Sequence, residues 1–317
     1  MAAPDVMKPA ELVLCAAVAR RYYLAGRTKV EIAEEFALSR FAVARLLDRA
    51  RSSGIVRIEI GRPGPIDVEL SSRLQDAYGL QHVVVVDVQA QDAAAVREAL
   101  GAVAADLLME IVTPQDVLGV AWARAVSAMA EAVTALPAVP VVQLTGSMLD
   151  DETTDSSVEL VRRLAGIAGG PAVCFYAPMI VPDATTATVL RQQSEVAGAF
   201  GRFGTVTKAV AGIGWWSAGE SMLYEAATPR ERAALERQGV CAEFSGVLVT
   251  PEGEPVQTEL TGRLIAIDAE QMRAIPEVLA VPYGVRKAPA VLAALRSGMV
   301  TSLVTHTKLA EALLDQR

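Results

Sequence analysis

Apolar residues in the first part of the chain recur every three to four positions, which is the spacing of one face of a helix. This pattern predicts three helices, over residues 8–25, 28–36 and 39–53. Two of these helices begin with a capping signal, because Thr28 and Glu31 have the spacing of a capping box and Ser39 is a favourable N-cap residue. The alternating sequence IVRIEI at 55–60 then predicts a strand.

From residue 83 onward, short apolar runs alternate with helical patterns. The runs predict strands at 83–87, 117–121, 140–145, 172–177, 206–214, 246–250, 263–267, 278–284 and 302–305. The helical patterns lie at 92–110, 123–135 and 156–168. Strands that alternate with helices form a mostly parallel sheet covered on both faces. The predicted fold class is therefore α/β, a doubly wound domain preceded by a small helical one.

The boundary between the two predicted domains lies in the Gly- and Pro-rich stretch GRPGP at 61–65, which is typical of a linker. We expect one domain over residues 1–60 and a second over 61–317. Charge also changes at this point. Residues 1–60 carry 10 Lys and Arg against 7 Asp and Glu, a net +3, whereas residues 61–317 carry 19 against 30, a net -11. The overall charge of -8 therefore conceals a basic N-terminal part.

Residues 28–53 have the spacing of a helix-turn-helix motif. Its inner face would be formed by Ile32, Ala33, Phe36, Val43, Leu46, Leu47 and Ala50. The opposite face of the second helix then carries Phe41, Arg45 and Arg49 at i, i+4 and i+8, which is the side that a recognition helix presents to the major groove of DNA. A strand at 55–60 would serve as a wing.

The candidate DNA contacts divide into two groups. We expect contacts to base edges from the start of the second helix, at Arg40, Phe41, Ala42 and Arg45, and a further DNA contact from Ser39. Contacts to phosphates are expected from Thr28, Lys29, Arg49 and Arg51. The alternative interpretation is a solvated basic helix in a three-helix scaffold, and the alternative for Phe41 is a place in the hydrophobic core.

Other features of the sequence exclude several classes of protein. Cys15, Cys174 and Cys241 are too few and too widely spaced for a disulfide framework or a zinc site. No signal peptide is apparent, and no apolar run approaches the ~20 residues that span a bilayer. With only His82 and His306 as histidines, we expect no metal centre and no cofactor. These features indicate a cytoplasmic protein with no membrane association.

The sequence IAEEFALSRFAVARLLDRARSSGIVRIEI at 32–60 resembles the N-terminal domain of SorC/DeoR-type sugar-responsive transcriptional regulators. Further motifs follow in that family's order, namely GVAWAR at 119–124, QLTG at 143–146, GIG at 212–214, GVCAE at 239–243, GVRKAPA at 284–290, ALRSG at 294–298 and LVT at 303–305. The resemblance covers about residues 20–315. It implies a C-terminal sugar-binding domain similar to phosphosugar isomerases and deaminases, and a homo-oligomer, a dimer or commonly a tetramer, whose affinity for operator DNA changes when a sugar or sugar phosphate binds.

In an open α/β sheet, ligands bind beyond the carboxyl ends of the strands, so the turns there are the candidate effector site. The family motifs and these turns together assign effector contacts to Gly119, Ala121, Trp122, Ala123, Arg124, Gly146, Ser147, Gly212, Gly214, Glu243 and Lys287. Amides at the start of the helix after residue 123 suit an anion. Glu243 would accept from sugar hydroxyls, and Lys287 would neutralise a phosphate or bind a hydroxyl. The alternatives are turn glycines, surface charges and, for Trp122, a place in the core.

The sequence also departs from the family pattern. Ala121, Ala123 and Ala125 stand where the family usually has Ser, Gly and Thr, so two hydroxyl donors are missing. Glu243 replaces an aspartate, Tyr283 a glycine and His306 an aspartate. The effector is therefore left open between a phosphorylated sugar, an unphosphorylated sugar or polyol, and an unusual ligand.

Three functions compete at this stage. The leading hypothesis is a transcription factor, not an enzyme, that is controlled by a sugar, polyol or sugar phosphate. A sugar-phosphate isomerase or deaminase is the second, although the turns offer no convincing acid–base pair. The third is a regulator that has lost its ligand and only assembles on DNA.

Overall fold

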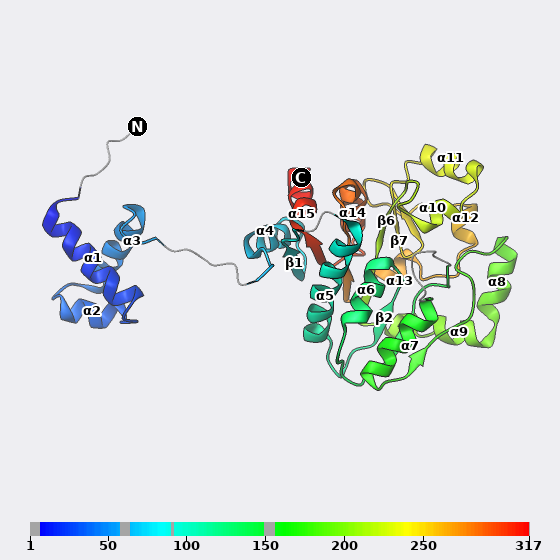
Figure 1. The fold of residues 1–317 in the computed structure, drawn as a ribbon, viewed down its shortest axis with the longest axis horizontal. Helices are drawn as coiled ribbons and strands as arrows, with labels where there is room; N and C mark the ends of the chain where they lie inside the picture. Colours follow the sequence, from blue (N-terminus) through cyan, green and yellow to red (C-terminus); the bar gives the residue numbers. More distant parts are fainter. Residues whose placement is uncertain (1–6, 58–63, 90–91, 149–155, 317) are drawn as a thin grey trace. The chain divides into compact units, whose positions relative to one another are not determined.

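The computed structural model describes residues 7–57, 64–89, 92–148 and 156–316. The chain divides into two compact units, Met1–Gly61 and Arg62–Arg317 (Figure 1). No helix in the described ranges is long and apolar enough to cross a membrane.

The N-terminal unit consists of three helices, which confirms the helices expected from the sequence. They are α1 (Pro9–Tyr23), α2 (Lys29–Glu35) and α3 (Arg40–Ser52). Thr28 and Glu31 form the expected capping box, and the Ser39 hydroxyl accepts from the Ala42 amide at 3.1 Å. Apolar side chains from all three helices form one core, made of Cys15, Val18, Ala19, Ile32, Ala33, Val43, Leu47 and Ala50.

The turn between α2 and α3 passes through Ala37, which has a left-handed φ of 53°. The strand expected at 55–60 is not seen at its described positions. Ile55 and Val56 lie in a bend, and the Val56 amide donates to the carbonyl of Ala50 at 2.9 Å, so this segment folds back on α3 instead of pairing with a strand. Residues 58–60 lie outside the described residues.

The second unit is built on a seven-stranded sheet in which every pairing is parallel. Its strands are β1 (His82–Val86), β2 (Leu118–Val120), β3 (Val141–Gln143), β4 (Ala172–Val173), β5 (Lys208–Ala211), β9 (Glu277–Ala280) and β10 (Ser302–His306). Their order across the sheet is β1-β10-β9-β5-β2-β3-β4. From β2 the chain builds toward β4 on one side, and from β5 it builds toward β10 on the other. The point where the direction reverses lies between β2 and β5.

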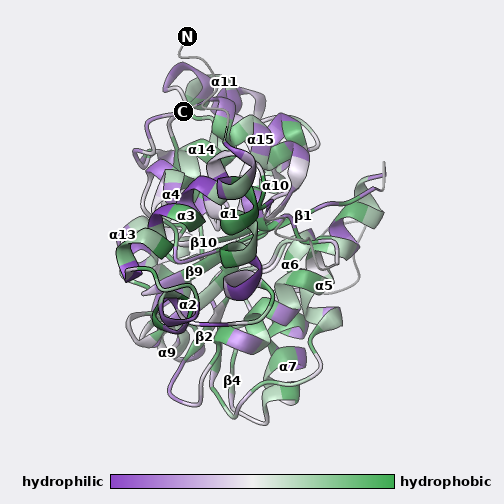
Figure 2. Ribbon diagram, turned by 90° about the vertical axis from the view of Figure 1, so that its left-hand side faces the viewer, coloured by the Kyte–Doolittle hydropathy of each residue, from purple (hydrophilic) through white to green (hydrophobic). Residues whose placement is uncertain are grey.

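Alternate residues of these strands enter two hydrophobic cores on opposite faces of the sheet. Val85, Ala209 and Leu303 pack toward one face, which is covered by α4 (Val68–Tyr78), α14 (Ala288–Arg296) and α15 (Thr307–Asp315). Val120, Val210 and Val304 pack toward the other, under α5 (Ala93–Ile111), α6 (Arg124–Ala132) and α7 (Ser157–Ala168). Figure 2 shows both hydrophobic and hydrophilic residues on α7, as expected for a helix with one buried side. The predicted doubly wound α/β fold is confirmed.

A second, three-stranded antiparallel sheet was not expected from the sequence. It consists of β6 (Ile213–Trp215), β7 (Ala242–Phe244) and β8 (Val247–Val249). The run at 206–214 was predicted as one strand, but it contributes β5 to the large sheet and β6 to the small one, with Gly212 between them. The run at 263–267 forms only isolated bridges, of Leu264 with Ile180 and Ala266 with Thr145.

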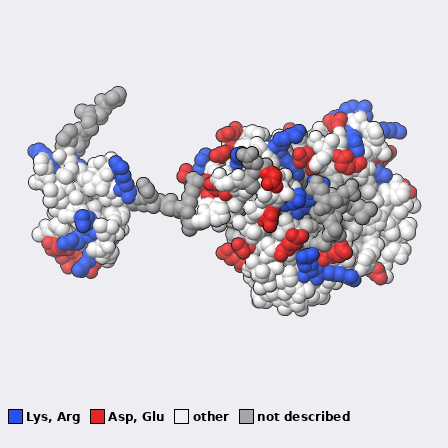
Figure 3. All heavy atoms as spheres, viewed as in Figure 1, with Lys and Arg blue, Asp and Glu red and all other residues white. Residues whose placement is uncertain are grey.

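Shorter helices complete the second unit. They are α8 (Ala184–Gln192), α9 (Ser194–Phe200), α10 (Met222–Ala226), α11 (Pro229–Arg237), α12 (Glu259–Gly262) and α13 (Ala269–Arg273), with 3-10 turns at Phe203–Thr205 and Val285–Lys287. On the face shown in Figure 3, acidic and basic side chains of this unit are interspersed. The segment before α4 is bound to β1, because Ile66 bridges to Val86 and the Asp87 amide donates to the Pro65 carbonyl at 2.6 Å.

Four adjacent strands begin with polar residues that converge on one buried carboxylate. Glu277, the first residue of β9, accepts from Lys208 Nζ, His82 Nδ1 and Ser302 Oγ, each at 2.7 Å. Burial opposes ionisation of Glu277, but these three hydrogen bonds outweigh it, so the pKa of the carboxyl lies below its usual range. The network ties β1, β10, β9 and β5 together at their amino ends.

Replacing Glu277 by Ala is expected to reduce the free energy of unfolding of the second unit by about 3 kcal/mol, because Lys208 would be left without its buried partner. Urea unfolding followed by tryptophan fluorescence measures this unit alone, since Trp122, Trp215 and Trp216 all lie in it. The exposed Glu270→Ala is the matched control and should change the free energy by less than about 0.5 kcal/mol. Because the pKa of Glu277 is lowered on folding, the difference between wild type and Glu277→Ala should shrink below about pH 4. Equal stability of the two variants at pH 7 would contradict this assignment.

Candidate functional site

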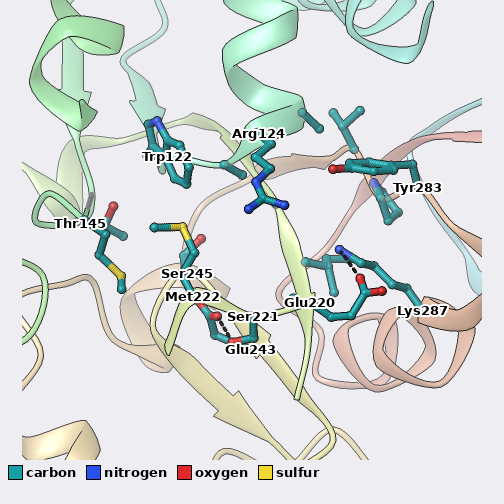
Figure 4. Close-up of a pocket in the computed structure, with 18 of the residues that line it drawn as sticks. Trp122, Arg124, Thr145, Glu220, Ser221, Met222, Glu243, Ser245, Tyr283 and Lys287 are labelled. Carbon is teal, nitrogen blue, oxygen red and sulfur yellow. Dashed lines mark hydrogen bonds and ion pairs between the residues drawn. The ribbon is translucent and has the colours of Figure 1, made fainter. Parts of the chain in front are cut away.

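A cavity of about 380 Å³ lies at the carboxyl ends of the parallel strands, where the order of the sheet reverses. Its walls come from the turns that follow β2, β3, β5 and β9 and from the small antiparallel sheet (Figure 4). This is the position at which open α/β sheets bind ligands.

The turn between β2 and α6 supplies one wall. Trp122, Ala123, Arg124 and Ala125 line the cavity, and Figure 4 shows the Arg124 side chain pointing into it between Trp122 and Tyr283. Two predicted contacts from this motif are not brought to the cavity. Gly119 lies inside β2, where an added Cβ would meet the side chains of Leu144 and Val206 at 2.9 Å, and Ala121 is fully buried in the core. Both are packing positions, because Gly119 lies within β2 and Ala121, directly after the strand, is buried in the core below the cavity.

Close backbone approach explains the glycines that do line the cavity. A Cβ on Gly212 would overlap that of Ala123, and a Cβ on Gly146 would lie 2.6 Å from the backbone of Met179. Ser147, the neighbour of Gly146, is not among the lining residues, because its backbone pairs with Ala177 and Met179. The turn after β3 therefore presents Gly146 and Thr145 to the cavity in place of the expected serine.

Glu243 of β7 supplies a half-buried carboxyl group to the cavity. The Ser221 hydroxyl donates to its Oε2 at 2.6 Å, and Gly214 on the neighbouring strand leaves room for it, since a Cβ there would lie 3.1 Å from the same oxygen. Burial raises the pKa of Glu243, although hydrogen bonds from Ser221 and from backbone amides, with the charge of Lys287, act in the opposite direction. A carboxyl in this setting is suited to accept hydrogen bonds from ligand hydroxyls.

Lys287 lies at the opposite wall, immediately before α14. Its ammonium group is 3.4 Å from a carboxylate oxygen of Glu220 and 5.2 Å from the centre of the Tyr283 ring (Figure 4). Among the described residues, the cavity is lined by three basic and three acidic side chains, namely Arg97, Arg124, Lys287, Glu220, Glu225 and Glu243. An incoming anion would therefore compete with Glu220 for Lys287.

Several lining residues were not predicted from the sequence, among them Arg97 of α5, Thr145, Glu220, Ser221 and Met222. Glu220 and Ser221 belong to the connection between β6 and α10, and Met222 begins α10; the small sheet carries this segment over the strand ends. No spacing rule relates them to the turn after β2. In the described part of the chain, no group of three or more His, Cys, Asp or Glu residues is arranged to hold a metal ion.

The candidate DNA-binding residues fall into two groups in the structure. Arg40, Phe41 and Arg45 are exposed on α3, and no hydrogen bond or ion pair joins these arginine side chains to another described residue. Arg49 forms an ion pair with Glu11 of α1, and Arg51 one with Asp48 at 2.6 Å. The charge of Arg49 is thus partly used to hold α3 against α1.

The remaining candidates at the helix starts also make contacts within the unit. The hydroxyls of Thr28 and Ser39 cap α2 and α3, and Ala42, which supplies the amide that binds Ser39, is half-buried. The Lys29 ammonium group lies 5.8 Å from the centre of the Tyr22 ring. Since both hydroxyls already serve as caps, the side chains of Arg40, Phe41 and Arg45 are the part of α3 that is open to a partner.

Comparison with known proteins places the chain in a family. The model of the Sugar-bind family, described as "Putative sugar-binding domain", matches residues 66–315. The chain belongs to this family. It is 28% identical to an uncharacterized transcriptional regulator, YjhU, of Escherichia coli K12, over 92% of each chain. It is also 28% identical to the transcriptional regulator LsrR of Klebsiella pneumoniae, covering 96% of this chain and 94% of the relative.

Two solved structures show the same fold. The full-length sorbitol operon regulator SorC of Klebsiella pneumoniae aligns with a TM-score of 0.73 and 23% identity, over 96% of this chain and 98% of that one. A domain of a possible sugar-binding transcriptional regulator from Arthrobacter aurescens aligns with a TM-score of 0.71 and 23% identity, over 81% of this chain and all of that one. The resemblance to SorC/DeoR-type regulators is confirmed.

One departure from the sequence pattern of SorC/DeoR-type regulators, His306, holds the cavity wall of this Sugar-bind chain in place. His306 ends β10, and its Nε2 accepts from the Gly284 amide at 3.0 Å, next to Tyr283. Burial and the nearby charge of Lys308 lower the pKa of His306. The neutral imidazole is therefore the form that supports the loop.

The second unit is expected to lose stability when the pH falls from 7.5 to 5.5, because the imidazole takes up a proton more readily in the unfolded chain, where its pKa is about 6.5. The contribution of the neutral His306 ring to the free energy of unfolding is fully present above about pH 6.5, the usual pKa of a histidine in an unfolded chain. It is lost below that pH, by at most about 1.4 kcal/mol per pH unit. Fluorescence-detected thermal unfolding across this range should show a smaller slope for His306→Gln, which keeps an acceptor and does not titrate. An unchanged slope would assign the pH dependence to another group.

Proposed function

We propose that the chain is a cytoplasmic, DNA-binding transcriptional regulator whose affinity for operator DNA is controlled by a sugar, polyol or sugar phosphate. The observation that carries the proposal is the combination, on one chain, of a capped helix with exposed Arg40 and Arg45 and a polar cavity at the strand ends of a Sugar-bind domain. The name of the SorC relative, a sorbitol operon regulator, agrees with both parts.

The cavity supports a polyhydroxylated effector. Glu243 and Ser221 form a hydrogen-bonding pair on one side, Lys287 and Glu220 form an ion pair on another, and Trp122 and Tyr283 provide flat apolar surfaces. Sugars combine hydroxyl edges with apolar ring faces, so this mixture suits them. A phosphate group would interact with Arg124 and the first amides of α6, although Ala125 offers no hydroxyl where the family usually has threonine.

Control of DNA binding follows from coupling between the two units in an oligomer. A single N-terminal unit has a small positive charge, so two linked copies are needed for strong binding to two half-sites. We propose that the second unit forms this homo-oligomer, and that the effector binds one arrangement of it better than another. The equilibrium between the arrangements then changes by the difference in effector affinity.

A sugar-phosphate isomerase or deaminase is the second candidate, favoured by the raised pKa of Glu243, which would suit a general acid. Incubation of the chain with sugar phosphates, followed by product analysis, tests it. Turnover that is lost in Glu243→Gln would support the enzyme. Its absence, with operator binding present, would support the regulator.

Effector binding is expected to raise the melting temperature of the second unit. Sugars, polyols and their phosphates are screened one by one. A true effector at about 1,000 times its dissociation constant should raise the free energy of unfolding by about 4 kcal/mol. Lys287→Ala should remove the shift, because the cavity loses its charged donor opposite Glu243. The matched control is Arg237→Ala, which removes an exposed positive charge outside the cavity. A shift that survives in Lys287→Ala would exclude this lysine from the site.

Arg45→Ala is expected to weaken binding to an operator duplex by about 1–3 kcal/mol, because a contact to a base edge is lost. The duplex is obtained by selection from a random library with the full chain, and affinity is measured by fluorescence anisotropy at several salt concentrations. Arg20→Ala removes the same charge from exposed α1 and should have a much smaller effect. Equal losses in both variants would indicate a general charge effect and contradict the recognition-helix assignment.

A further inference from the structure

Phe41 is a large apolar side chain that the N-terminal unit leaves in solvent. It is the second residue of α3 and is 78% exposed, whereas Val43, Leu47 and Ala50 on the other side of the same helix are buried. The exposure excludes the alternative that Phe41 completes the hydrophobic core of the unit. The residue is therefore not required for folding and is available to a partner.

The surroundings of Phe41 are cationic. Arg40 precedes it in the sequence, and Arg45 lies one helical turn further along the same side of α3. The acidic residue of this helix, Asp48, lies two turns away and is paired with Arg51. An exposed phenyl ring with one arginine next to it in the sequence and another on the same side of the helix favours a partner that is anionic and also offers an apolar group.

Double-stranded DNA is such a partner. Its phosphates surround a major groove whose base edges present one apolar group, the C5-methyl of thymine. The first turn of a recognition helix is the part that comes closest to those edges, and Phe41 lies in that turn because Ser39 begins the helix.

We propose that Phe41 determines part of the operator sequence by packing against a thymine methyl group. The inference rests on the proposed function and adds one base that the operator must contain. Arg40 and Arg45 would bind phosphates or hydrogen-bonding base edges, whereas Phe41 requires a thymine at one position of each half-site. A second copy of this unit is the competing partner for the ring, but the two flanking arginines would repel their counterparts across such a contact.

Uracil tests the methyl group directly, because it pairs as thymine does but lacks the C5-methyl. In the duplex selected with the full chain, each thymine is replaced in turn by deoxyuridine, in both half-sites. At one position the wild type should bind about fourfold more weakly per half-site, the value of burying one methyl group. Phe41→Ala should bind the thymine duplex at least fourfold more weakly and should bind the two duplexes equally.

Two variants serve as controls. Arg45→Ala should bind both duplexes more weakly and keep the fourfold preference for thymine. Leu24→Ala removes an equally exposed apolar side chain, 77% exposed and outside α3, and should behave as the wild type. Thermal unfolding of each variant by circular dichroism verifies that the unit remains folded.

Three results would overturn the inference. The wild type could show no preference for thymine over uracil at any position, or Phe41→Ala could keep the preference. Alternatively, Phe41→Ala could lower the oligomeric state in sedimentation while the uracil pattern is unchanged, which would assign the ring to a contact between copies. In each case the wild type still binds DNA and the proposed function stands, whereas a chain that selects no duplex would refute that function itself.

Discussion

The close approach of Gly212 to Ala123 is the constraint on which the effector cavity depends. Because Gly212 has no side chain, the chain passes the turn after β2 at contact distance and enters the small sheet one residue after β5 ends. This route carries Glu243 and the segment around Ser221 over the carboxyl ends of the parallel strands. A side chain at position 212 would separate the two walls. The alanine at 123, where the family usually has glycine, supplies the methyl group that fills this contact.

Local signals in the sequence predicted those parts of the fold that local physics determines. Thr28 and Ser39 mark helix starts because their hydroxyls satisfy amides three residues away, and the apolar runs at 83–87 and 302–305 are strands because both of their faces are buried. The run at 263–267 is equally apolar but pairs only at isolated positions, since burial of a segment does not require a ladder. Periodicity could not distinguish these cases.

The candidate site was predicted only as far as its residues lie in the turns after strands. Trp122, Arg124, Gly146 and Gly212 are in such turns and do line the cavity. Gly119 and Ala121 match the same motif but lie in buried β2 and just beyond its end. Glu220 and Ser221 were missed because the small sheet that delivers them is formed by residues 213–249, and its long-range pairing leaves no periodic signal.

The arginines of α3 show a similar limit of prediction from the sequence. A helical-wheel argument placed Arg45 and Arg49 on one side and assigned both to DNA, Arg45 to base edges and Arg49 to phosphates, because it contains no information about α1. The structure separates them through Glu11, 38 residues earlier, which pairs with Arg49. Such a partly exposed pair contributes at most about 1 kcal/mol to stability, so its main effect is to orient the helix. Arg40 and Arg45 form no ion pair with another described residue, so their charges are available to a binding partner.

The imidazole of His306 connects the cavity wall to the first described residues of the second unit through a series of contacts. Gly284 binds His306, His306 is the register partner of Val86 in β1, and Val86 bridges to Ile66, which follows the connection from the N-terminal unit. Three successive contacts, the first through the His306 ring and the other two between backbones, thus join the turn at Gly284 to Ile66. Because closely packed contacts leave little free space, a movement of the turn at Gly284 would be passed through His306 and along β1 as far as Ile66.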